Sequence, residues 1–281
     1  MKPAPITMSN LISHRFRGFS KYENTLDGLR AALDFGVINL EFDVRMAACG
    51  TPMVYHDEYA KDARGKVRHL CDLIASSFKN TGGDFARMPT FEALLDVVAS
   101  HKNTEAKLLV DIKDAGFEHE IHALLSLYRM QDRAVYVSWL PEVLYALDAL
   151  APTIPKCLSH WCQPVNALIR AHHKVFKSKD GNIPLQDSID FKGGYIMGVR
   201  SGWQITAPIK GQFLDLLKRS QGGICVPQDM ATKELCQYYQ GHGLFVSTFS
   251  YTDKTHLMDH RDTLGIDLYF IDNKKLFIDL T

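Results

Sequence analysis

Short apolar runs alternate along the chain with longer stretches in which apolar residues recur every three or four positions. The short runs are typical of parallel strands buried on both faces, and the longer stretches are typical of helices that cover a sheet. The predicted strands are residues 11–14, 37–44, 108–112, 134–139, 155–159, 195–199, 223–226, 244–249 and 268–271. The predicted helices include residues 25–35, 90–99, 118–128 and 141–150.

Residues with capping chemistry mark the ends of two predicted helices. Thr25 and Thr90 stand where a side chain can accept a hydrogen bond from the first free amides of a helix. Gly36 follows the first helix, at the position where a left-handed residue closes the last turn. We therefore expect helices to begin directly after both threonines and the first helix to end at Gly36.

The regular alternation of strands and helices predicts an α/β fold, namely a (β/α)8 barrel of the TIM type. Nine strand candidates compete for eight places, so one of them, expected within residues 163–210, belongs to an insertion. No linker rich in proline, glycine or serine, no internal repeat and no low-complexity run divides the sequence. We expect residues 1–281 to form one domain.

Composition and charge narrow the function classes. The chain is 46% hydrophobic and 23% charged, which is enough apolar material for a large core and excludes a disordered chain. Thirty-two basic residues balance 32 acidic ones, so no net positive charge is present to hold nucleic acid or an anionic membrane surface. The six cysteines are dispersed, which favours free thiols.

The sequence shows neither a secretory leader pattern nor an apolar run of about 18 residues, which a membrane-spanning helix requires. We therefore expect no transmembrane segment and a cytoplasmic location. The sequence leaves the oligomeric state open.

Carboxylates stand inside or at the end of two predicted strands. Glu41 and Asp43 are two residues apart and so lie on the same face of their strand, and Asp111 repeats the pattern on the next strand. Buried carboxylates that converge need a cation, and hard oxygen ligands suit Mg²⁺ or Ca²⁺. Lys113, on the same face as Asp111, is a candidate cation for a phosphate oxygen.

Two histidines stand near the ends of the first apolar segments. His14-Arg15 ends the first predicted strand, and His56-Asp57 follows an apolar run. Taken singly, a histidine there is commonly a structural donor, and two carboxylates on a strand commonly face solvent. Their joint occurrence at successive strand ends favours an active site, because barrel enzymes assemble their sites there.

These residues form a pattern that resembles the glycerophosphodiester phosphodiesterase family. The similarity covers roughly the first 150 residues and the last 40. It implies a TIM-type barrel with a short insertion at about residues 57–89, after the second strand, and a metal-dependent phosphodiesterase. The matching residues are His14-Arg15, Glu23-Asn24-Thr25, Glu41-Phe42-Asp43, Gly50-Thr51-Pro52, Val54-Tyr55-His56-Asp57, Met88 to Leu95, Asp111-Ile112-Lys113 and, weakly, Gly265-Ile266-Asp267 and Asp272-Asn273.

The resemblance implies a role for each matching residue. Carried over by position, Glu41, Asp43 and Asp111 hold one divalent metal ion, and His14 and His56 form the acid–base pair. Arg15 and Lys113 bind phosphate oxygens. Glu23, Asn24 and Asp57 would support these residues without binding the substrate. Glu23 would orient Arg15 or a metal ligand, and Asp57 would position His56 or stabilise its loop. The attacking group is either water or a neighbouring hydroxyl of the substrate.

The implied reaction converts a glycerophosphodiester into an alcohol and sn-glycerol 3-phosphate, within glycerol and lipid metabolism. Four departures from the family pattern keep alternatives open: Phe16 replaces a glycine, Asp111 replaces a glutamate, Ser247 replaces the tryptophan of the late strand, and Ile271 replaces the threonine of the final Thr-Asp. One alternative is a phospholipase D-like enzyme that acts on lysophospholipids or sphingolipids. Another is a catalytically silent barrel that binds a phosphorylated ligand. Trp139 or Trp203 is a candidate replacement for the missing aromatic wall.

Two further histidine clusters are His119/His122 and His172-His173, the second of them in a basic stretch with Arg170 and Lys174. We interpret neither as a metal site.

Overall fold

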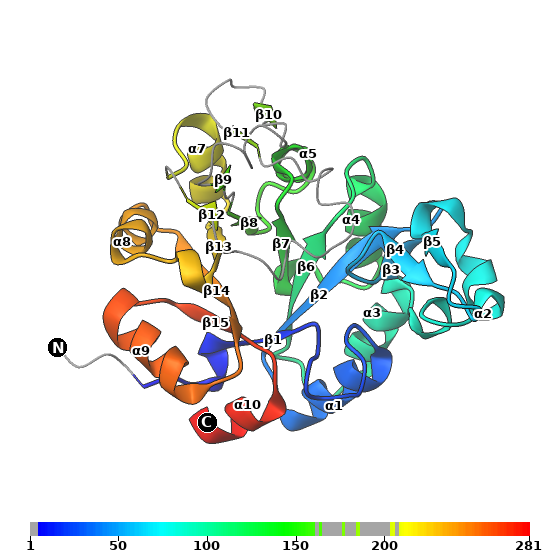
Figure 1. The fold of residues 1–281 in the computed structure, drawn as a ribbon. Coiled ribbons are helices and arrows are strands. Elements are labelled where there is room, and N and C mark those ends of the chain that lie inside the picture. Colours follow the sequence, from blue (N-terminus) through cyan, green and yellow to red (C-terminus); the bar gives the residue numbers. More distant parts are fainter. Residues whose placement is uncertain (1–4, 161–162, 165–175, 178–183, 186–202, 206–207) are drawn as a thin grey trace.

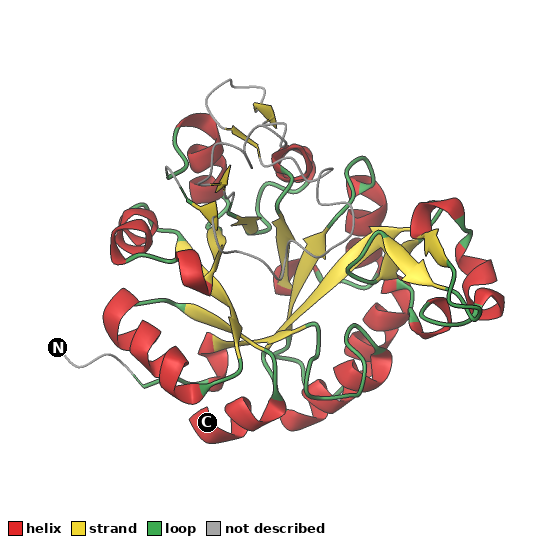
Figure 2. Cartoon of the chain, viewed as in Figure 1, coloured by secondary structure: helices red, strands yellow, loops and turns green. Residues whose placement is uncertain are grey.

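Eight parallel strands close into a barrel, with helices outside it (Figures 1 and 2). The computed structural model describes residues 5–160, 163–164, 176–177, 184–185, 203–205 and 208–281. Each barrel strand pairs with the next, and the last pairs with the first. In this order the strands are β1 (Leu11–His14), β2 (Asn39–Met46), β6 (Lys107–Ile112), β7 (Ala134–Ser138), β8 (Lys156–Ser159), β13 (Gly223–Pro227), β14 (Phe245–Tyr251) and β15 (Leu268–Ile271).

The predicted (β/α)8 fold is thus confirmed, and eight of the nine strand candidates are the barrel strands. The ninth candidate, residues 195–199, lies outside the described residues. The longer helices are α1 (Leu26–Phe35), α3 (Phe91–Ser100), α4 (Glu118–Leu127), α5 (Pro141–Leu150), α7 (Gly211–Arg219), α8 (Lys233–Gly241), α9 (Lys254–Leu264) and α10 (Lys274–Leu280). None of the helices in the described ranges is long and apolar enough to cross a membrane.

The predicted helix caps are present. The side chain of Thr25 accepts a hydrogen bond from the amide of Gly28, and Thr90 does the same for the amide of Ala93. Gly36 has a φ of 90° at the end of α1, a conformation that costs a glycine little. These caps fix where α1 and α3 begin, and so they limit the length of the loops that follow β1 and β3.

The alternation of side chains along each strand builds two apolar layers. One face packs against the helices and forms the larger core, in which Leu11, Leu40 and Leu108 are fully buried. The opposite face forms a smaller cluster inside the barrel, made of Ile12, Leu109, Val137, Cys157, Cys225 and Phe270. Two residues after Ile12 and Leu109, the same inward face carries His14 and Asp111. The polar site therefore sits directly above an apolar floor.

The segment after β2 is a small subdomain beside the barrel. Strand β3 (Pro52–Val54) pairs antiparallel with β2, and a hairpin of β4 (Tyr59–Lys61) and β5 (Val67–His69) precedes α2 (Phe78–Thr81). Its own apolar cluster is Ala47, Met53, Ala60, Leu70, Phe78, Phe85 and Met88. The insertion predicted at residues 57–89 falls on this segment.

Most of the second predicted insertion, residues 163–210, lies outside the described residues. The described parts of it include four two-residue strands that form two antiparallel pairs. Strand β9 (Gln163–Pro164) pairs with β12 (Trp203–Gln204), and β10 (Phe176–Lys177) pairs with β11 (Pro184–Leu185).

Candidate active site

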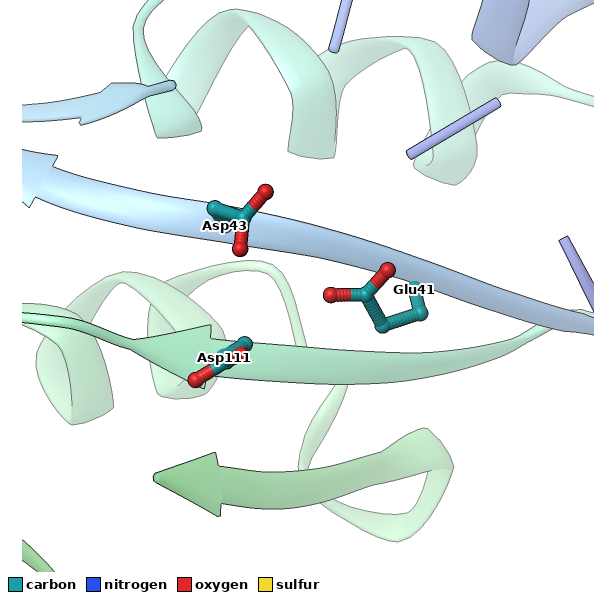
Figure 3. A group of neighbouring side chains, drawn as sticks. All are labelled: Glu41, Asp43 and Asp111. Carbon is teal, nitrogen blue, oxygen red and sulfur yellow. The ribbon is translucent and has the colours of Figure 1, made fainter. Parts of the chain in front are cut away.

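Three buried carboxylates from the neighbouring strands β2 and β6 converge (Figure 3). Glu41 and Asp43 share one face of β2, and Asp43 stands directly opposite Asp111 in the register of the two strands. One oxygen from each carboxylate lies within 4.8 Å of the other two. Among the described residues, this is the one group of three acidic, histidine or cysteine side chains close enough to hold a metal ion.

Two cations, the buried Arg15 and the partly buried Lys113, partly compensate the three carboxylates. Nε of Arg15 lies 3.0 Å from Oδ2 of Asp43, and the backbone amide of Arg15 donates to Oε2 of Glu41 at 3.2 Å. Nζ of Lys113 lies 3.0 Å from Oδ1 of Asp43 and 2.5 Å from Oδ2 of Asp111. The two residues expected to bind phosphate oxygens therefore both contact the carboxylate cluster.

The carboxylates differ in how strongly their charge is compensated. Burial, followed by the neighbouring charge of Asp43, raises the pKa of Glu41 well above its usual value. Burial acts in the same direction on Asp43, but Arg15 and Lys113 outweigh it and hold the pKa of Asp43 well below its usual value. A divalent cation beside Glu41 would stabilise its ionised form.

The donor set fits a hard divalent metal. All three candidate ligands are carboxylates, which Mg²⁺ and Ca²⁺ prefer. Oδ1 of Asp111 is buried and has no hydrogen-bond partner among the described residues. A buried carboxylate oxygen without a partner is costly, and coordination to a cation would remove that cost.

His14 is held by a carboxylate from the opposite end of the chain. Its Nδ1 donates to Oδ1 of Asp272 at 2.6 Å, and its Nε2 lies 4.0 Å from Oε2 of Glu41. Asp272 also accepts hydrogen bonds from Arg17 at 3.0 Å and from Ser250 at 2.7 Å. Burial, followed by the charge of Arg15, lowers the pKa of His14 to about 4, so the ring is neutral at pH 7.

His56 has a similar partner close in sequence. Its Nδ1 donates to Oδ1 of Asp57 at 2.6 Å. The residue before it, Tyr55, donates its amide to the carbonyl of Asp43 at 3.1 Å, which attaches this segment to β2 beside the carboxylates. Burial, followed by the charge of Arg15, lowers the pKa of His56. Both histidines thus present Nε2 as the free ring nitrogen.

The loop after β1 is shaped by residues with positive φ. Arg15, Phe16 and Asn24 have φ values of 54°, 59° and 55°. Phe16, which replaces the family glycine, is fully buried and packs its ring against Phe42. The loop therefore keeps a left-handed turn without a glycine at this position, and the ring anchors it to the core.

The supporting residues of the loop contact the site directly. The side-chain amide of Asn24 donates to Oδ2 of Asp43 at 2.9 Å. Glu23 pairs with Arg15 at 3.3 Å and with Arg17 at 2.6 Å. These are the contacts that an orienting role for Glu23 and Asn24 requires.

Sequence reasoning gave no role to Asp272, Arg17 or Ser250. Asp272 follows β15 directly, so it carries the same signal as the other candidates, a polar residue at a strand end.

An aromatic residue of β14 also lies near the site. The ring of Phe249 packs against Phe270, whose ring contacts His14. An aromatic surface therefore lies near His14 although the family tryptophan is replaced.

Of the two rejected histidine clusters, His119/His122 lies on α4, outside the carboxylate cluster. Nδ1 of His122 hydrogen-bonds the hydroxyl of Tyr136 at 2.8 Å, a contact that joins α4 to β7. His172 and His173 are outside the described residues.

Comparison with known proteins identifies the same family as the sequence motifs. The model of the Glycerophosphoryl diester phosphodiesterase family matches residues 12–160. The human Glycerophosphodiester phosphodiesterase 1 is 27% identical over 164 residues, which cover 53% of this chain and 48% of the human protein. The chain thus spans about half the length of the curated relatives that it matches.

Solved structures are similar over nearly the whole chain. A protein from Silicibacter pomeroyi DSS-3, proposed to be a glycerophosphoryl diester phosphodiesterase, superposes with a TM-score of 0.70 at 20% identity, over 99% of this chain and 95% of that one. An Oleispira antarctica phosphodiesterase in complex with its product sn-glycerol-3-phosphate has a TM-score of 0.66 at 18% identity, over 96% of each chain. At these identities the similarity shows the fold.

Proposed function

Because the chain belongs to the glycerophosphoryl diester phosphodiesterase family, we propose that it is a metal-dependent hydrolase that cleaves glycerophosphodiesters into an alcohol and sn-glycerol 3-phosphate. The observation that carries this proposal is the convergence of Glu41, Asp43 and Asp111 beside two histidines that each donate Nδ1–H to a carboxylate. The product named in the Oleispira antarctica structure is consistent with it.

Glu41, Asp43 and Asp111 would hold one Mg²⁺ or Ca²⁺ ion. Such an ion neutralises charge on the phosphate and polarises a phosphoryl oxygen when it is bound. Arg15 and Lys113 would add positive charge on the same side, as phosphoryl transfer requires. In the structure both cations contact Asp43, so we expect a bound phosphate to share them with that carboxylate.

His14 and His56 would divide the proton transfers. One imidazole, with Nε2 unprotonated, accepts the proton of the attacking hydroxyl, and the other, in the imidazolium form with a proton on Nε2, donates that proton to the oxygen of the departing alcohol. The first ring ends protonated and the second neutral, and proton exchange with solvent restores both. Each ring has its other nitrogen engaged by a carboxylate, Asp272 for His14 and Asp57 for His56. That contact fixes the tautomer and the direction of Nε2. The attacking hydroxyl is that of water or of the substrate's own glycerol.

A lipid substrate is the second candidate. The aromatic rings of Phe249 and Phe270 beside His14 provide an apolar surface on one side of the site. A lysophospholipid or sphingolipid would place a chain or backbone against such a surface, whereas the small headgroup alcohols of soluble glycerophosphodiesters need no apolar wall.

The test is turnover on matched substrates. Release of sn-glycerol 3-phosphate from glycerophosphocholine and glycerophosphoethanolamine is measured with Mg²⁺, Ca²⁺ or EDTA, and choline release from lysophosphatidylcholine is measured in parallel. We expect metal-dependent release from the soluble diesters and its loss in His14→Ala and His56→Ala. Exclusive turnover of lysophosphatidylcholine supports the lipid candidate. Binding of glycerophosphocholine without any turnover, in saturating metal, supports a silent barrel and contradicts both.

A further inference from the structure

A pair of histidines on α9 lies outside the site described above. His256 and His260 are four residues apart on the helix and so share a face. Their Nε2 atoms are 3.0 Å apart, their ring centroids are 4.3 Å apart, and their planes are inclined at 73°. His256 is exposed and His260 is half-buried.

His260, the less exposed histidine of the pair, contacts a buried tyrosine through its other ring nitrogen. Nδ1 of His260 lies 2.9 Å from the hydroxyl of Tyr251, which in turn lies 2.7 Å from Oγ1 of Thr248. Both Tyr251 and Thr248 are buried. When Nδ1–H donates to Tyr251 and Tyr251 donates to Thr248, Nε2 of His260 carries a free lone pair directed at His256. This is the outer hydrogen bond that metal-binding histidines typically make.

We propose that His256 and His260 chelate a borderline divalent transition-metal ion such as Zn²⁺ through their Nε2 atoms, with water completing its coordination. Zinc–nitrogen bonds of about 2.0–2.1 Å place two nitrogens of a tetrahedral site about 3.3 Å apart. The observed 3.0 Å separation therefore needs an adjustment of only a few tenths of an ångström. Imidazole nitrogen suits zinc, copper and nickel and disfavours Mg²⁺ and Ca²⁺, so this site and the carboxylate cluster select different metals.

The protonation of the pair suits this role. The 3.0 Å contact between the two Nε2 atoms is a hydrogen bond in which one ring donates and the other accepts, so one Nε2 of the pair already carries a lone pair. Metal binding requires the remaining Nε2 proton of the pair to leave for solvent or to move to Nδ1 of His256.

The experiment is a zinc titration by calorimetry at pH 7.5 in excess Mg²⁺, which occupies the carboxylate cluster. The untagged full chain is compared with His256→Gln, whose exposed position on α9 tolerates the change. We expect the wild-type chain to bind one zinc ion more than His256→Gln. The matched control is His119→Ala, which removes another exposed helical histidine and is expected to keep that ion.

A second variant tests the supporting hydrogen bond. Tyr251→Phe removes the hydroxyl behind His260, and we expect it to weaken zinc binding roughly 10-fold or more, because loss of such an outer partner typically costs that much. Wild-type stoichiometry and affinity in His256→Gln overturn the proposal. Equal loss of the ion in His119→Ala also overturns it, because zinc would then bind surface histidines without selectivity.

Discussion

Oδ1 of Asp272 lies 2.6 Å from Nδ1 of His14, although 258 positions separate the two residues in the sequence. Closure of the barrel produces this contact, because β15 pairs with β1 and Asp272 and His14 stand at the adjacent ends of these strands. The ion pair with Arg17 and the hydrogen bond from Ser250 hold the carboxylate in place. Partly through these contacts, the pKa of Asp272 falls to about 2 although burial alone would raise it.

Replacing Asp272 by Asn is therefore expected to lower kcat on the proposed glycerophosphodiester substrate by roughly 100-fold or more, with a smaller change in KM. The amide can donate to Nδ1 and so favour the wrong tautomer of His14, which removes a correctly directed proton-transfer group. Steady-state kinetics and thermal unfolding of the variant are measured together. Asp272→Glu is expected to restore part of kcat. A wild-type kcat in the well-folded Asn variant would exclude the positioning role.

Removal of one carboxylate tests the metal site without relying on activity. Added Mg²⁺ or Ca²⁺ is expected to raise the melting temperature of the wild-type protein, because an ion that binds only the folded state stabilises it. Asp111→Asn should abolish this shift, since Asp111 supplies the buried oxygen that lacks a hydrogen-bond partner among the described residues. Calorimetric scans with and without metal measure it.

The control for this experiment is Glu120→Gln, which neutralises an exposed carboxylate on α4. It should keep the wild-type response to metal. An equal metal-induced shift in Asp111→Asn would show that the carboxylate cluster is not the binding site.

Local patterns predicted most of the barrel and of the carboxylate cluster. The two-residue period of β2 places Glu41 and Asp43 on one face, and the order of parallel strands brings Asp111 opposite them. These relationships need only short stretches of sequence and the rule that parallel strands end at one edge. They are therefore readable without coordinates.

The partner of His14 could not be predicted in the same way. Asp272 has the same strand-end signal as Asp111, but only the closed barrel shows which strand becomes the neighbour of β1. Phe16 illustrates a different limit. Its replacement of a glycine is visible in the sequence, but only the structure shows that Phe16 adopts the left-handed conformation and that its ring packs in the core.

Gly18 is expected to be a sensitive position of the same loop. It has a φ of 78°, and a Cβ built there would lie 2.4 Å from the backbone nitrogen of Lys274 and 2.6 Å from Cα of Asn273. Gly18→Ala should lower the free energy of unfolding by about 3 kcal/mol, since a left-handed alanine and a backbone clash both contribute. Urea denaturation measures the loss.

Gly50→Ala provides the matched comparison, because Gly50 has a φ of 74° but no atom within 4 Å of the added Cβ. It should cost only about 1 kcal/mol, the strain of the left-handed conformation. Equal losses in the two variants would mean that the loop moves away from α10 and that the close approach carries no energetic cost.

Lys156 is a fully buried lysine at the start of β8. Its burial leads to a prediction of how the free energy of unfolding depends on pH. Its Nζ donates to the carbonyl of Ala151 at 2.5 Å and lies 3.8 Å from Oδ1 of Asp148. Burial lowers the pKa of Lys156 to about 8, because the ion pair with Asp148 compensates desolvation only in part. Asp148 has a second partner in Arg219 and does not depend on Lys156 alone.

The sign of the effect follows from proton binding. Below pH 8 both folded and unfolded chains hold the proton of Lys156, so the folded state bears the full cost of the buried charge. Between about pH 8 and the usual lysine pKa of about 10.4, mainly the unfolded chain holds the proton, and this group then makes stability rise with pH. Lys156→Met removes this buried charge. Replacement of a buried ion by an apolar side chain of similar size often raises the free energy of unfolding.

We therefore expect Lys156→Met to exceed the wild-type free energy of unfolding most at pH 7, and this advantage to shrink by up to about 3 kcal/mol as the pH approaches 10. Denaturation of both proteins at a series of pH values gives the difference directly, because contributions from other groups cancel. Lys102→Met, at an exposed lysine, should follow the wild-type curve in parallel. A constant difference between Lys156→Met and wild type would mean that Lys156 keeps an ordinary pKa despite its burial.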